Sequence, residues 1–157
     1  LKDSNNVLTK SIYERLKKKV NGNIERVFFI DRIREKEFIN HCGQASVLLD
    51  PLYFGAGNSF HESMYYGTPT VTLPSNYLKA RIVKAAYDQM KIENSPVVNT
   101  VDEYVNLSVE IANIEEKKAL DQKNYFKNQA SKYLFENKLF INELENIFIK
   151  IMNNKIN

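Results

Sequence analysis

A short segment that precedes a predicted helix carries the residue types that bind phosphate. Gly55 and Gly57 stand two positions apart, and glycine lets a backbone come close to a ligand. The first N–H groups of a helix lack partners within the helix, and the helix dipole adds partial positive charge there. We therefore predict unpaired N–H groups at Asn58, Ser59 and Phe60, joined by the side-chain donors of Asn58 and Ser59. Together these groups predict a site for a diphosphate.

Glu62 lies one turn into the same predicted helix, and two interpretations of it stay open. A carboxylate on the side facing the loop is placed to accept both hydroxyls of a ribose. Ser59 and Glu62 also have the spacing of a capping box, in which the glutamate accepts the Ser59 backbone N–H. His61 lies about 100° away around the helix, and a ligand contact from it is the less favoured interpretation.

The same segment lacks the features of two common nucleotide sites. Gly57-Asn58-Ser59 does not read Gly-Lys-Ser/Thr, which disfavours a Walker-type hydrolase. The glycines also do not follow the first predicted strand with the spacing of a dinucleotide fold. No Asp-x-Asp arrangement of carboxylates is present, so we expect neither a metal nor another cofactor.

The elements around this segment alternate between strands and helices. This alternation is typical of βαβ crossovers and predicts an α/β fold with a Rossmann-like parallel sheet that has helices on both faces. Ligands bind in such sheets at the carboxyl ends of the strands, which here selects the loops 31–34 and 51–59. The predicted strands are 26–30, 46–50, 70–73 and 96–98, and the predicted helices of this part are 8–20, 35–44, 60–66 and 78–90.

Beyond residue 100 the apolar spacing is helical throughout. We predict helices at 102–113, 115–135 and 138–152, the first of them capped by Thr100 or Asp102. The whole chain, 1–157, is predicted to form one domain, with an α/β core at about 7–100 and a helical tail at about 101–153. Aromatic residues expected in the core and between helices are Tyr125, Phe126, Tyr133, Phe135, Phe140 and Phe148.

Composition excludes several classes of protein. The 157 residues suit one ordinary domain of about 100–150 residues. The net charge of +3 is too small to indicate a nucleic-acid or membrane surface. A single cysteine, Cys42, excludes an internal disulfide framework and a cysteine-built zinc site. No apolar run approaches the ~20 residues of a membrane span, so we expect a soluble, cytoplasmic protein without nucleic-acid or membrane partners.

Three stretches in the same order resemble the C-terminal half of a GT-B glycosyltransferase: 47–51, 54–59 and 62–74. The likeness is to the O-linked N-acetylglucosamine transferase family and its bacterial relatives, which often carry tetratricopeptide repeats upstream. It extends from about Arg26 to the final helix. Since the chain begins at Leu1 without a leader, we expect it to be a piece of a longer polypeptide.

The resemblance implies a site for a UDP-sugar donor. The diphosphate maps onto Gly57, Asn58 and Ser59, and the ribose onto Glu62. The base maps onto the earlier loop, at Arg32, Ile33 and nearby Phe38. Animal members have His-Thr-Thr in place of Gly57-Asn58-Ser59, a histidine at Phe38 and a lysine at Glu35. A phenylalanine can still stack on a base, but it donates no hydrogen bond.

The resemblance also implies an activity. It is transfer of a sugar, with UDP-N-acetylglucosamine as the expected donor, to a Ser/Thr or other hydroxyl of a protein or glycan, with inversion. In this interpretation no catalytic residue lies in this chain, because the acceptor site, the phosphate-neutralising lysine and any catalytic histidine belong to the N-terminal half. The chain alone is then expected to be inactive.

Two alternatives to a transferase stay open. A GT-B enzyme that epimerises a UDP-sugar would share the donor site, and a noncatalytic binding or scaffold module would keep only the sheet and helices. Lys79, Arg81 and Lys84 follow the third predicted strand, where they could meet the sugar or a phosphate. A solvated helix face is the favoured interpretation of these three cations.

Overall fold

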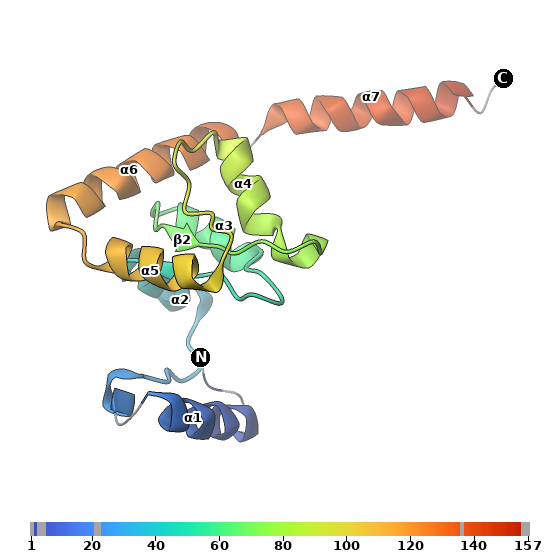
Figure 1. Cartoon of the computed structure of the whole chain (residues 1–157). Helices are drawn as coiled ribbons and strands as arrows, with labels where there is room; N and C mark the ends of the chain where they lie inside the picture. Colours follow the sequence, from blue (N-terminus) through green and yellow to red (C-terminus); the bar gives the residue numbers. More distant parts are fainter. Residues whose placement is uncertain (1, 3–5, 21–22, 136, 155–157) are drawn as a thin grey trace. The chain divides into compact units, whose positions relative to one another are not determined.

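The computed structural model describes residues 2, 6–20, 23–135 and 137–154. The chain divides into two compact units, Leu1–Phe38 and Ile39–Asn157, and each is described by itself. Figure 1 shows the order of the elements along the chain. The helices are α1 (Val7–Lys19), α2 (Glu35–Gln44), α3 (Asn58–Met64), α4 (Ile82–Met90), α5 (Val101–Ala112), α6 (Glu116–Tyr133) and α7 (Lys138–Asn154), with single 3-10 turns η1 (Asn23–Arg26) and η2 (Leu78–Ala80).

The first unit contains α1, η1 and an extended segment that leads into α2. The rings of Tyr13 and Phe29 meet edge to face, with centroids 6.2 Å apart. The predicted strand 26–30 is wrong, because among the described residues this segment joins no sheet. A strand is stabilised by a ladder and by cover on its faces. Here Ile30 accepts one backbone hydrogen bond, from Lys2, and the side chain of Phe28 is 83% exposed.

The second unit holds a small parallel sheet. Strand β1 (Leu48–Leu49) pairs with β2 (Thr70–Val71), with Leu48 opposite Thr70 and Leu49 opposite Val71. One further parallel bridge joins Thr72 to Val97. Helices and parallel strands alternate as predicted, but the described part of the chain does not form the full Rossmann-like sheet. Proline offers no N–H to a ladder, and Pro51, Pro74 and Pro96 border these short apolar stretches.

The predicted helices of the second unit are observed with small shifts at their ends. Helix α5 begins after Thr100, whose hydroxyl accepts the Glu103 N–H at 3.1 Å and so confirms the predicted cap. The predicted helix 78–90 is divided, because the 3-10 turn η2 comes first and α4 begins only at Ile82.

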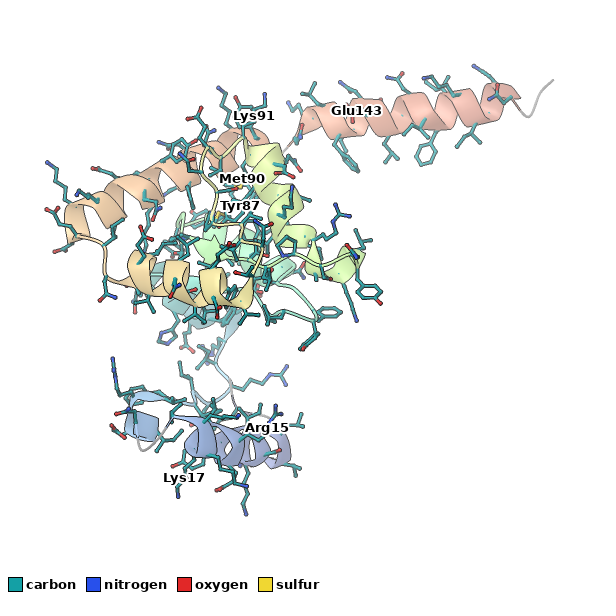
Figure 2. All side chains as sticks on the ribbon, in the orientation of Figure 1. Arg15, Lys17, Tyr87, Met90, Lys91 and Glu143 are labelled. Atoms are coloured by element: carbon teal, nitrogen blue, oxygen red, sulfur yellow. The ribbon has the colours of Figure 1, made fainter. Side chains whose placement is uncertain are left out.

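The main core of the second unit lies where α6 packs against α3 and α4 (Figure 1). Tyr87 and Met90 of α4 are fully buried in its middle (Figure 2). The Tyr87 ring meets Phe60 of α3 and Phe126 of α6 edge to face, at centroid distances of 5.2 Å and 5.7 Å. The Tyr87 hydroxyl donates to the Thr70 carbonyl at 3.0 Å and accepts the Thr70 N–H at 2.8 Å. This side chain therefore joins the helical core to the sheet.

Helix α7 departs from the packing expected of it. Phe126 is buried as predicted, but Phe140 and Phe148 of α7 are 59% and 56% exposed. The expectation that these two rings pack in the core or between helices is wrong. In Figure 2 the side chains of α7, Glu143 among them, project from the helix along its length. Within the described residues, no helix is both long and apolar enough to cross a membrane.

Candidate functional site

The glycine-containing loop is closed by a buried aspartate. Asp50 follows β1 directly, and its side chain is only 3% exposed. Its Oδ1 accepts the Ala56 N–H at 2.6 Å, and its Oδ2 accepts the Thr72 hydroxyl at 2.6 Å. One carboxylate therefore ties the end of the loop to the residue that follows β2.

Gly55 supplies the second closure of the same loop. Its N–H donates to the Lys79 carbonyl at 2.8 Å. A Cβ at this position would lie 3.1 Å from both Asp50 Oδ1 and the Lys79 carbonyl oxygen. Because the Lys79 neighbour is backbone, it has little freedom to give way. The loop needs glycine here for close approach, whereas a Cβ at Gly57 would meet only Ile82 Cδ1, at 4.0 Å.

Two free N–H groups stand at the start of α3. The helix begins at Asn58, after Gly57 as N-cap, and no side chain caps it. The prediction of an unpaired N–H at Phe60 is wrong, because this group donates to the Gly57 carbonyl at 3.1 Å and tightens the first turn. The N–H groups of Asn58 and Ser59 have no acceptor among the described residues. They are available to an anion.

Glu62 does not form a capping box, which was one of the two interpretations that its position allows. Ser59 is the second residue of α3 rather than its N-cap, and no side chain caps the helix. The Glu62 carboxylate is half-buried, and no hydrogen bond or ion pair engages it within the part of the chain described. Burial raises the pKa of the Cys42 thiol, and the negative charge of Glu62 raises it further. The carboxylate of Glu62 thus lies on the side of α3 that faces α2.

His61 faces a different neighbour. Its Nδ1 lies 3.0 Å from the Gly57 carbonyl oxygen, and since that oxygen only accepts, Nδ1 carries the hydrogen. The side chain borders a hollow of about 590 Å³ whose lining includes Arg81 and Lys84. Lys84 is paired with Asp88 at 2.6 Å.

The structure thus places two of the three cations considered in the sequence beside the first turn of α3. No ion pair or side-chain hydrogen bond of Arg81 occurs among the residues described. Lys79 acts through its backbone carbonyl, which holds Gly55, while its Nζ lies 6.0 Å from the Tyr77 ring centroid. Of the two cations that line the hollow, Arg81 is therefore the one that is free to meet a ligand.

The residues expected to meet the base belong to the other unit of the chain. Arg32, Ile33 and Phe38 lie in the first unit, whereas the loop and α3 lie in the second. Ile33 and Phe38 are half-buried and Arg32 is exposed. A base contact from these residues stays a prediction.

Sequence reasoning missed Asp50, Thr72 and Tyr104. The Tyr104 hydroxyl donates to the Asp50 backbone carbonyl at 3.0 Å, so α5 also holds the backbone at the end of β1. Burial raises the pKa of Tyr104 to about 12, and the charge of Asp50 contributes to the shift. The signal in the sequence was an aspartate at the end of an apolar strand, directly before Pro51 and a loop with two glycines.

Comparisons with known proteins show the fold. No family model matches the chain, and no curated protein matches it by sequence. Among solved structures, the chain is similar to an O-GlcNAc transferase of Thermobaculum terrenum carrying the substitution K341M, with a TM-score of 0.73 and 17% identity. The match covers 87% of this chain and 26% of that one, so the chain spans about a quarter of its neighbour's length. The fold is similar to part of a GT-B-like glycosyltransferase, as the sequence resemblance predicted.

Proposed function

We propose that this chain is the donor-binding part of a glycosyltransferase and that it holds the diphosphate of a UDP-sugar at the start of α3. The observation that carries the proposal is the pair of free N–H groups at Asn58 and Ser59, presented by a loop that is closed on Asp50. The likeness of the fold to an O-GlcNAc transferase supports the same interpretation independently.

The free groups around this turn suit the chemistry of a diphosphate leaving group. When a glycosidic bond to a diphosphate breaks, negative charge develops on the phosphate oxygens. Donors already aimed at those oxygens stabilise the charge without reorganising. The Asn58 and Ser59 N–H groups take this role, aided by their side chains, and Arg81 adds positive charge from the neighbouring hollow.

Glu62 is proposed to bind the ribose. Glu62 is half-buried, its carboxylate lies on the side of α3 that faces α2, and no protein donor occupies it among the residues described. A carboxylate accepts hydrogen bonds from two neighbouring hydroxyls at once, which is the arrangement a ribose offers. The absence of the capping box leaves this role open to Glu62.

The finer parts of the proposal come from the family resemblance and the name of the structural neighbour. The donor is UDP-N-acetylglucosamine, the acceptor is a Ser/Thr or other hydroxyl, and the reaction inverts the anomeric carbon. In this interpretation the chain supplies only donor binding, and the catalytic groups and the acceptor site belong to another part of the enzyme. An epimerase acting on a UDP-sugar would use the same donor site and would differ in those other groups.

Calorimetry with UDP tests the proposal. We expect binding that Asn58→Ala weakens, because it removes a side-chain donor at the turn, by about tenfold or less. The matched control is Asn106→Ala, on the exposed face of α5, which should bind as the wild type does. No binding of UDP at millimolar concentration would favour a noncatalytic module. Turnover of the full-length protein with a panel of UDP-sugars separates a transferase from an epimerase.

A further inference from the structure

We infer that Asp50 is a positioning residue for the proposed donor site: its buried carboxylate holds the loop 51–57 in the form that presents the Asn58 and Ser59 N–H groups. The inference rests on the proposed function and deepens it, because it names the residue on which the shape of the site depends.

The first support is the way in which the Asp50 carboxylate is satisfied. Both of its oxygens accept hydrogen bonds at 2.6 Å, one from the loop at Ala56 and one from the Thr72 hydroxyl. Among the described residues, no cation forms an ion pair with this side chain, although it is only 3% exposed. A buried carboxylate depends on its donors, since leaving it without them is costly. The loop donor is therefore held tightly.

The second support is the short path from Asp50 to the free N–H groups. Ala56 is held by Asp50, and the preceding residue, Gly55, is held by the Lys79 carbonyl. The next residue, Gly57, turns its carbonyl toward α3, where it accepts the N–H groups of Phe60 and His61. Because three consecutive residues are fixed in this way, the N–H groups that follow them are fixed too.

The third support is that the other hydrogen bonds of Asp50, made by its backbone, are separate from the contact between its side chain and Ala56. The Asp50 backbone N–H donates to Val71, and its backbone carbonyl accepts the Tyr104 hydroxyl. These bonds hold the strand and α5, and neither touches the loop. The side chain alone connects Asp50 to Ala56, so its removal can be separated from a general loss of structure.

Substitutions of Asp50 and Tyr104 in the whole chain provide the test. In Asp50→Ala, we expect the exchange of the Ala56 amide hydrogen to rise and the affinity for UDP to fall, each by about tenfold or more. In Asp50→Asn, the side-chain oxygen accepts from Ala56 while its NH₂ group donates to the Thr72 hydroxyl, so both properties should return toward the wild type. Tyr104→Phe is the matched control, because it removes a bond to the same residue and leaves the loop contact intact.

The outcomes separate the inference from the proposed function. An Asp50→Ala chain that keeps wild-type exchange at Ala56 and wild-type affinity for UDP overturns the inference, and so does an equal loss of both in Tyr104→Phe. If the wild type fails to bind UDP, the proposed function is wrong, and so is the role of Asp50 in ligand binding. The exchange of the Ala56 amide hydrogen still reports whether Asp50 holds the loop.

A second variant keeps the inference testable if Asp50→Ala does not fold. Thr72→Val has a similar volume and removes only the donor to Asp50 Oδ2. The carboxylate is then less constrained, and we expect faster exchange at Ala56 together with a smaller loss of UDP affinity than Asp50→Ala would give. Unchanged exchange and unchanged affinity in Thr72→Val overturn the inference.

Discussion

The carboxylate of Asp50 accepts the backbone N–H of Ala56 at 2.6 Å, across a loop of only five intervening residues. A side chain buried at the end of β1 thereby fixes the residue that precedes the turn into α3. The residues with free donors, Asn58 and Ser59, lie just beyond this contact. The shape of the candidate site is thus set from the interior of the second unit.

The two glycines of the loop should respond differently to alanine. Gly55→Ala should lower the free energy of unfolding, because its Cβ would press on Asp50 and on the Lys79 carbonyl. Gly57→Ala should lower it less, since its Cβ meets only Ile82 at 4.0 Å and the change costs only the poorer N-cap that alanine makes. If a diphosphate approaches the backbone closely, Gly57→Ala should still weaken UDP binding. Denaturant unfolding and calorimetry on both variants check this, and unchanged UDP affinity in Gly57→Ala would count against close approach.

Glu62 gives a prediction about the ribose. Glu62→Gln should reduce the affinity for UDP by about 10- to 100-fold, because hydrogen bonds to a charged acceptor contribute about 1.5–3 kcal/mol. The same variant should matter much less for 2′,3′-dideoxy-UDP, which lacks the hydroxyls. Glu110→Gln on the exposed side of α5 serves as the control. An equal loss for both nucleotides would show that Glu62 does not act through the ribose.

Much of the helical pattern could be predicted from sequence, because it depends on local spacing and capping. Helix α2 spans Glu35–Gln44 as its apolar positions indicate, and Thr100 caps α5 as expected. The extent of the sheet could not be predicted in this way. Whether the apolar stretch 27–30 joins a ladder depends on neighbouring strands, and none pairs with it among the described residues.

The candidate site, too, could be predicted from the sequence only in part. The turn at Gly57 and the donors of Asn58 and Ser59 follow from residue type and position. Asp50 could not be recognised as the residue that closes the loop, because its two partners lie 6 and 22 positions away in the sequence. The capping box does not form because α3 begins at Asn58, two residues before Phe60, where the helix would begin if Ser59 were its N-cap.

Stability should fall at alkaline pH through Tyr87, which is buried, and Tyr104, which is half-buried. Burial raises the pKa of Tyr104 from 10.0 to about 12, and the pKa of Tyr87 is raised as well. The unfolded chain releases these protons near pH 10, whereas the folded chain retains them to higher pH. The stabilisation is therefore fully present below pH 10 and is lost as pH rises toward 12.

Tyr104→Phe tests this pH dependence directly. The free energy of unfolding of the variant should decline less steeply between pH 10 and pH 12 than that of the wild type. The measurement is denaturant unfolding at a series of pH values. Parallel declines in the two proteins would contradict the assignment of this loss to Tyr104.

Lys123 of α6 should stabilise the end of α2. Its Nζ donates to the carbonyls of Gly43 and Ala45 at 2.8 Å and 2.7 Å. Lys123→Met keeps the apolar stem and removes the donors, so we expect a loss of about 1–3 kcal/mol in the free energy of unfolding. Lys117→Met, at an exposed position of the same helix, is the control and should change stability little. Equal stability of the two variants would contradict this role.

The most direct test of the donor site follows the amide resonances of the loop and α3 by NMR while UDP is added. We predict that the Asn58 and Ser59 amide protons move downfield and saturate, while the Phe60 amide, already bonded to Gly57, moves less. Resonances of Asn58 and Ser59 that stay unchanged at millimolar UDP would contradict it.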